Sequence, residues 1–344
     1  MIDKGKSLWK MVEEAEGKQL ADDEVRKVYT ALGEMYSDIK KEVGKVVVGQ
    51  QDVLEQVLVS VFTQSHALLE GFPGLGKTLI VKTLANIMDL SFKRIQCTPD
   101  IMPSDITGTY IIVEDESGNK SFRFERGPVF SNVVLADEIN RATPKAQSAL
   151  LEAMQERQVT VGNTTYKLDL PFFVLATQNP IEMEGTYPLP EAQLDRFLLK
   201  ILVKYPERDE EDRIIDLYTS EASPTVNKAI TKRQLLIIQE LTRKMPISSE
   251  LRRMVLDIVT NTRPAKNEFA KKYLDYGASP RAAIGLVLSS KARALLSGRN
   301  YVNKDDVKFM TYPVLRHRLI LNFESERKGI TEDEVIEEIL HEVG

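Results

Sequence analysis

Residues 71–78 read Gly-Phe-Pro-Gly-Leu-Gly-Lys-Thr and match the phosphate-loop pattern G-x-x-x-x-G-K-[ST] at every required position. A short apolar run precedes the loop at residues 66–70, and residues 79–87 follow it with the apolar spacing of a helix. This order constrains the fold strongly, because glycine backbone N–H groups and a helix N-terminus together form a cradle for an anion. The sequence therefore predicts a P-loop α/β domain rather than a chance glycine-rich turn.

A phosphate loop of this pattern assigns roles to its residues. The Lys77 side chain is expected to reach the β- and γ-phosphates of ATP or ADP, and the Thr78 hydroxyl to ligate Mg²⁺. The other residues expected to surround the phosphates lie in the loop and in the first turn of the helix: Gly71, Pro73, Gly74, Leu75, Gly76 and Leu79.

Two further apolar runs end in polar residues that suit nucleotide hydrolysis. Residues 132–136 lead into Asp137, expected to hold Mg²⁺, and Glu138, expected to polarise the attacking water. Residues 170–177 lead into Asn179, which can orient that water because parallel strands end at one crevice. An Asn-Pro turn is the alternative for Asn179.

The remaining pattern predicts two structural parts. Strands alternate with helices up to residue 205, which indicates a parallel sheet with helices on both faces. Two hairpins interrupt it, at 109–124 and 158–168. From residue 206 only helical periods appear, which predicts a C-terminal all-helical domain over 206–344. The core is expected over 39–205, and residues 1–38 form an N-terminal extension with a helix beginning near Val25.

Composition narrows the class of protein. The 344 residues are 42% hydrophobic and 28% charged with a net charge of −5, which fits a globular protein and disfavours a nucleic-acid-coating surface. A single cysteine, Cys97, excludes a disulfide framework, and no run is long enough to cross a membrane. Without a signal-like N-terminus, the expected location is cytoplasmic, with no direct membrane insertion.

Several ordered motifs together resemble the MoxR family of AAA+ ATPases. Besides the phosphate loop, they are Asp137-Glu138-Ile139-Asn140-Arg141-Ala142, Ala176-Thr177-Gln178-Asn179-Pro180, residues 189–197 (LPEAQLDRF) and Ser279-Pro280-Arg281-Ala282. The resemblance covers roughly residues 40–344. It implies an AAA+ α/β core with a helical lid, and ATP hydrolysis with Mg²⁺.

The resemblance also implies individual roles. Asn179 is similar to the sensor 1 residue, Arg196 to the arginine finger that reaches a neighbouring subunit's nucleotide, and Arg281 to sensor 2, acting on its own or on a neighbour's nucleotide. Val48, Gly49 and Gln50 would lie near the adenine, and Arg141 is similar to an arginine near the subunit interface, or forms a surface salt bridge.

An arginine finger supplied by a neighbouring subunit makes ATP hydrolysis depend on oligomerisation, so the resemblance implies a hexameric ring. It also implies that the ring remodels client proteins, together with a von Willebrand factor A domain protein as partner. Two alternatives remain: a nucleic-acid motor of the related helix-2-insert clade, which the acidic composition disfavours, and an ATP-binding switch scaffold. Lys120, Phe122, Arg123 and Phe124 in the first hairpin either grip a polymer or pack the hairpin onto its own domain.

Overall fold

A computed structural model describes residues 22–344 apart from 115, 117, 181–184 and 221–223. Residues 1–21 of the predicted N-terminal extension therefore lie outside the described part. The centre of the molecule is a five-stranded sheet in the order β2-β5-β8-β1-β9, and all its neighbouring strands are parallel. The strands are β1 (Ala67–Glu70), β2 (Phe92–Gln96), β5 (Val133–Asp137), β8 (Phe173–Gln178) and β9 (Leu199–Leu202).

Both faces of the central strands β5, β8 and β1 are buried, as the continuous apolar runs predict. Along β5, Val133 and Leu135 belong to one core, whereas Val134 and Ala136 belong to a second core on the opposite face. The first core also contains residues of α3 (Gln51–Phe62) and α4 (Lys77–Ile87), and the second contains residues of α6 (Pro144–Glu156). Helices therefore cover both faces, which confirms the predicted α/β architecture.

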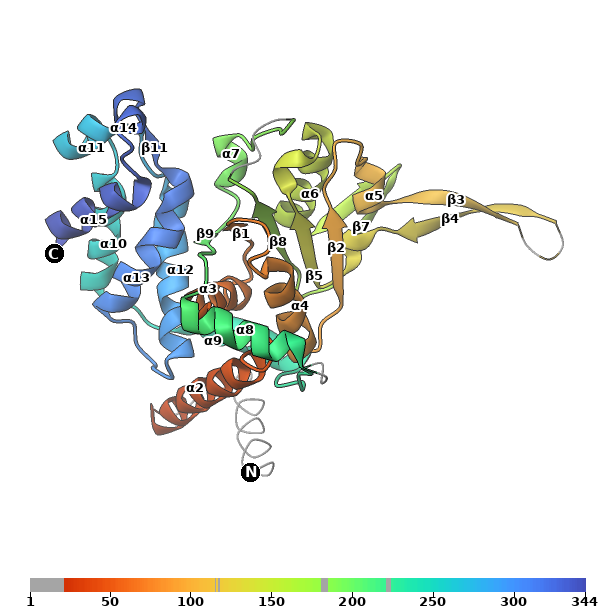
Figure 1. The fold of residues 1–344 in the computed structure, drawn as a ribbon, viewed down its shortest axis with the longest axis horizontal. Coiled ribbons are helices and arrows are strands. Elements are labelled where there is room, and N and C mark those ends of the chain that lie inside the picture. Colours follow the sequence, from red (N-terminus) through yellow and green to blue (C-terminus); the bar gives the residue numbers. More distant parts are fainter. Residues whose placement is uncertain (1–21, 115, 117, 181–184, 221–223) are drawn as a thin grey trace.

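Two helices that follow β9, α8 (Arg208–Thr219) and α9 (Lys232–Lys244), lie in the middle of the molecule near α3 (Figure 1). The later helices lie on the opposite side of the sheet from the long hairpin and form the lid. They are α10 (Ser249–Asn261), α11 (Glu268–Tyr273), α12 (Pro280–Leu296), α13 (Lys304–Leu315), α14 (Phe323–Arg327) and α15 (Glu332–Val343). Several of the C-terminal helices follow a side-chain cap, and Thr231 and Asn303 form capping boxes before α9 and α13. The lid also contains one short antiparallel pair that the periodicity does not predict, β10 (Leu274–Tyr276) with β11 (Ile320–Leu321).

One hydrophobic core extends from the sheet into the lid. It includes Leu199 of β9, Leu286 of α12 and Val314 of α13. The N-terminal helix α2 (Asp22–Val43) joins it, because Leu32 and Ile39 are fully buried in the same core. The described part of the N-terminal extension is therefore packed against the rest of the molecule.

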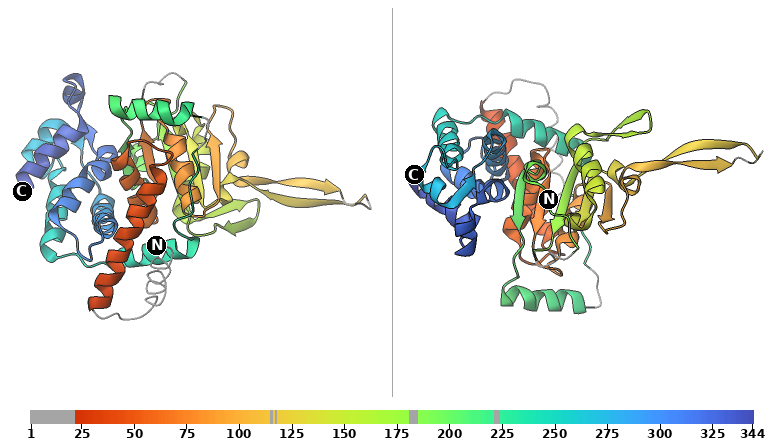
Figure 2. Two further views of the ribbon diagram at one scale, coloured as in Figure 1. Left: turned by 60° about the horizontal axis from the view of Figure 1, so that its bottom comes forward. Right: turned by 90° about the horizontal axis from the view of Figure 1, so that it is seen from above.

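Two hairpins project from the sheet domain (Figures 1 and 2). The longer is β3 (Gly108–Glu114) with β4 (Lys120–Arg126), and the shorter is β6 (Gln158–Val161) with β7 (Thr164–Lys167). Aromatic side chains join the two: Phe124 stacks on Tyr166 at 4.4 Å between ring centroids, and the Tyr110 and Tyr166 hydroxyls are 2.9 Å apart. Phe122, beyond this contact, is 76% exposed. Phe124 therefore packs the hairpin onto its own domain, which was one of the two alternatives. Phe122 does not, because its side chain is exposed.

Among the described residues, no helix is both long enough and apolar enough to span a bilayer.

Candidate nucleotide site

The phosphate loop joins β1 to α4 and has the backbone that its glycines permit. Gly74 (φ 84°) and Gly76 (φ 75°) adopt the left-handed conformation, and α4 begins at Lys77. The Lys77 ammonium donates to the carbonyls of Gly71 at 2.5 Å and Phe72 at 2.8 Å. Burial lowers its pKa, while the Asp137 and Glu138 carboxylates oppose that shift. The Lys77 ammonium is therefore close enough to interact electrostatically with Asp137 and Glu138, the two acids expected to complete the site.

The register of the sheet brings the predicted acid and amide residues to the same edge. Strand β1 pairs with β8 so that Glu70 lies opposite Gln178, and the Gly71 N–H donates to the Gln178 carbonyl at 3.4 Å. Asn179, the residue after Gln178, therefore lies directly beside the phosphate loop. Strand β5 ends at Asp137, next to β8 on the far side from β1. The loop, Asp137, Glu138 and Asn179 accordingly meet at the carboxyl edge of the strands.

A hydrogen-bond network fixes the two acids. The buried Thr177 hydroxyl donates to Asp137 Oδ1 at 2.6 Å and accepts the Glu138 backbone N–H at 2.8 Å. Glu138 has a left-handed backbone (φ 58°, ψ 52°), which is unusual outside glycine and sets the direction of its side chain. Its Oε2 accepts from Arg141 Nη1 at 2.9 Å. Arg141 thus forms the local salt bridge that was one of its two predicted roles.

A cavity of ≈ 530 Å³ opens beside the phosphate loop and suits a nucleoside. It contains seven of the residues predicted to bind the nucleotide: Val48, Gln50, Pro73, Gly74, Leu75, Gly76 and Leu79. Its opposite wall comes from α8, through Ile214, Ile215 and Tyr218. The Tyr218 hydroxyl donates to the Val46 carbonyl at 2.7 Å and closes this wall against the segment before α3.

Sequence reasoning missed the α8 wall. Tyr205 and Pro206, which also line the cavity, mark only the boundary between the predicted core and the predicted helical domain. The signal was present, since Ile214, Ile215, Leu217 and Tyr218 form an apolar group in the second half of a helix that begins with charged residues. Periodicity shows that such a helix has an apolar face but not which element it covers.

Arg196 and Arg281, the two arginines predicted to act on a nucleotide, lie away from the phosphate loop of their own chain. Strand β9 is parallel to β1 and pairs Leu199 with Ala67, at the amino edge of the sheet. Because Arg196 precedes Leu199, it lies at the edge opposite the phosphate loop. On the lid, Arg281 donates to Asp195 Oδ2 at 2.9 Å, so both arginines flank Asp195. Figure 1 shows α7 (Glu191–Leu194), which directly precedes this region, well separated from α8, the helix that lines the nucleoside cavity.

Asp195 is the centre of a junction between the lid and this segment. Besides Arg281, it accepts from Arg318 Nε at 2.7 Å through Oδ1 and from the Ser279 hydroxyl at 3.3 Å. The Arg318 side chain is only 3% exposed, whereas that of Arg281 is 57% exposed. The segment that includes Arg196 is therefore fastened to the base of the lid.

The residues expected to hold Mg²⁺ have suitable chemistry. Thr78 at the start of α4 and Asp137 at the end of β5 offer hydroxyl and carboxylate oxygens, the donors that Mg²⁺ prefers. Over the described residues, no group of three or more His, Cys, Asp or Glu side chains could hold a metal by itself. That donor set matches an ion bound by one or two protein oxygens together with substrate phosphates.

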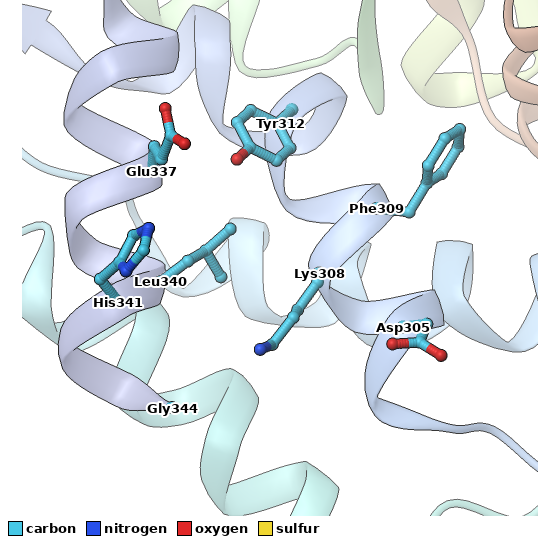
Figure 3. A pocket seen from close by; sticks show the side chains of 8 residues that line it. All are labelled: Asp305, Lys308, Phe309, Tyr312, Glu337, Leu340, His341 and Gly344. Carbon is cyan, nitrogen blue, oxygen red and sulfur yellow. The ribbon is translucent and has the colours of Figure 1, made fainter.

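A second hollow of ≈ 540 Å³ lies on the lid between α13 and α15 (Figure 3). Phe309, Tyr312 and Leu340 supply its apolar part, and Lys308 and His341 are among its polar residues. It shares no lining residue with the nucleoside cavity, so the two are separate features.

Comparison with known proteins agrees with this geometry. Residues 66–199 match the ATPase family associated with various cellular activities (AAA), and residues 267–339 match the AAA lid domain. The fold and the site therefore define an AAA-type P-loop ATPase with a helical lid.

Individual relatives specify the family. The chain is 44% identical over 306 residues to Chaperone MoxR1 of Mycobacterium tuberculosis, covering 88% of this chain and 80% of that one. It is 30% identical over 316 residues to Protein MoxR of Methylorubrum extorquens, covering 86% and 90%. The crystal structure of a candidate ATPase from Cytophaga hutchinsonii superimposes with a TM-score of 0.85 at 47% identity, covering 94% and 97%. The chain belongs to the MoxR family of AAA+ ATPases.

Proposed function

We propose that this protein hydrolyses ATP at a seam between adjacent copies of the chain. The observation that carries the proposal is the position of Arg196, at the sheet edge opposite its own phosphate loop. A strand of this length separates the two edges by about 10 Å, and Arg196 lies further back still. A guanidinium at that position would reach the nucleotide of a second copy.

The same position favours action of Arg281 on the neighbour's nucleotide. Its ion pair with Asp195 holds it beside Arg196, away from the nucleoside cavity of its own chain. Two cations from one copy would then face the phosphates of the next. Because Arg318 ties the same aspartate to the lid, a change in lid angle would move both arginines together.

Within each seam the chain's own residues have distinct tasks. Lys77 and the loop N–H groups bind the phosphates, while Glu138 accepts a proton from the attacking water and Asn179 orients it. Arg196 offsets the negative charge that develops as the terminal phosphoryl group departs. Bound Mg²⁺, held by Thr78 and Asp137, would supply charge neutralisation on the phosphate oxygens.

We further propose that hydrolysis drives remodelling of client proteins by a hexameric ring, with a von Willebrand factor A domain protein as partner. Family membership and a relative named as a chaperone support this class of activity. The projecting β3–β4 hairpin supplies a contact surface, because Ile112 lies opposite Phe122 on one face and both are exposed. In this arrangement residues 39–205 act as the motor core, 206–344 as the lid and 1–38 as an extension.

Dilution tests the shared seam. The rate of ATP hydrolysis per chain should fall as the protein is diluted below the ring's dissociation constant, and Glu138→Gln protein with Mg²⁺ and ATP should sediment as six copies. A rate per chain that stays constant while the protein sediments as a monomer would overturn the proposal. Proteins that co-purify with the Glu138→Gln variant, but not with Lys77→Ala, would identify the client.

A further inference from the structure

Arg94, on the edge strand β2, contacts the aspartate expected to hold Mg²⁺. Its Nε and Nη2 atoms donate to Asp137 Oδ2 at 2.9 and 2.5 Å. Thr177 occupies the other oxygen, Oδ1, at 2.6 Å. Both carboxylate oxygens of Asp137 therefore accept strong hydrogen bonds from the protein itself, one pair of them from a cation.

The contact follows from strand register. Strands β2 and β5 are parallel, with Arg94 opposite Leu135 and Gln96 opposite Asp137. Arg94 lies two residues before Gln96 and on the same face of β2, so its side chain extends along the strand toward Asp137 and also donates to the Gln96 amide oxygen. This face of β5 is the one that packs toward α4, the helix that begins with the phosphate-binding Lys77 and Thr78.

The exposure of the two partners differs. The Arg94 side chain is 48% exposed, whereas that of Asp137 is 12% exposed. A half-exposed guanidinium can swing into solvent at small cost, because its charge remains hydrated there. A buried carboxylate beside Glu138 instead needs a counter-charge at all times. Asp137 can therefore exchange one cation for another, and Arg94 is the partner that is able to leave.

We propose that Arg94 is a positioning residue that competes with Mg²⁺ for Asp137. In the nucleotide-free protein it neutralises Asp137 and keeps the carboxylate in place, and binding of Mg²⁺ with ATP displaces it. Because Mg²⁺ must displace Arg94, the competition raises the Mg²⁺ concentration needed for tight nucleotide binding. The site then binds ATP tightly only when Mg²⁺ binds with it. This inference rests on the proposed ATP site.

The test is the Mg²⁺ dependence of binding of a fluorescent ATP analogue, measured without turnover in the Glu138→Gln background. Arg94→Gln and Arg94→Ala should lower the half-saturating Mg²⁺ concentration about three- to tenfold, as expected for removing one partly screened competing charge. Arg94→Lys, which keeps the charge, should stay near the parent value. The difference should shrink at high salt.

Lys93→Ala is the matched control, because it removes a cation from the adjacent position, on the opposite face of the same strand. An unchanged Mg²⁺ requirement in Arg94→Gln, or an equal change in Lys93→Ala, would overturn the competition. A higher Mg²⁺ requirement in all three Arg94 variants would also overturn it and assign Arg94 a purely structural role. Binding of the analogue by the parent protein with no Mg²⁺ dependence would likewise overturn the competition, whereas no binding at any Mg²⁺ concentration would show that the proposed ATP site itself fails.

Discussion

Removing the Asp195 carboxylate should destabilise the protein far more than removing its exposed partner. In Asp195→Ala the Arg318 guanidinium stays buried without a counter-ion, and burial already acts to lower the pKa of Arg318. Losing one partner of a buried ion pair costs about 3–5 kcal/mol. Arg318 keeps backbone carbonyl partners at Phe197, Leu198 and Val314, so we expect the lower end, about 3 kcal/mol.

Arg281→Ala provides the comparison, because Arg281 pairs with the same carboxylate at 2.9 Å but is largely exposed. Its loss should cost about 0–1 kcal/mol. Equilibrium denaturation in guanidinium chloride measures both free energies of unfolding. Equal destabilisation by the two variants, or a cost below about 1 kcal/mol for Asp195→Ala, would refute the assignment of Arg318 as the buried anchor.

Three further variants test other contacts. Tyr218→Ala should weaken binding of a fluorescent ADP analogue about tenfold, because it removes apolar area from the cavity wall. Tyr276→Ala, at an exposed position on the lid, should leave the affinity unchanged. Equal effects of the two variants would contradict the assignment of Tyr218 to the wall of the nucleoside cavity. Burial lowers the pKa of His66 from 6.5 to about 4, so the unfolded chain takes up the proton first and stability falls as the pH drops through this window. His66 should contribute about 3 kcal/mol of that loss, and His66→Gln should show a correspondingly shallower fall in unfolding free energy between pH 7 and 4.5; an unchanged slope would refute it. Phe124→Ala should cost about 2 kcal/mol in denaturation experiments because it breaks the stack on Tyr166, and Phe122→Ala less than about 0.5 kcal/mol; the reverse order would exclude the packing role.

The carboxyl-edge part of the site could be predicted from sequence because each piece has a local signal. Asp137 and Asn179 each follow an apolar run, and parallel strands bring the ends of such runs to one edge. Helix α6 also has a local signal, because Thr143 caps its first turn and Pro144 begins it.

The rest depends on contacts between segments distant in sequence. Arg94 meets Asp137 only because β2 pairs with β5 in one particular register, and Arg318 reaches Asp195 across 123 positions of the chain. Side-chain periodicity carries no information on such pairings. The β10–β11 pair was missed because two- and three-residue strands are too short to show an alternating pattern.

Mixing two inactive variants tests the shared seam most directly. Lys77→Ala chains keep a finger but lose the phosphate-binding lysine, and Arg196→Ala chains keep the phosphate site but lose the finger. In a randomly assembled ring of equal parts, about a quarter of the seams combine an intact site with an intact finger. The mixture should therefore hydrolyse ATP at about a quarter of the wild-type rate, far above the sum of the separate proteins. A mixture no more active than that sum, or an Arg196→Ala protein with the full wild-type rate, would contradict the account.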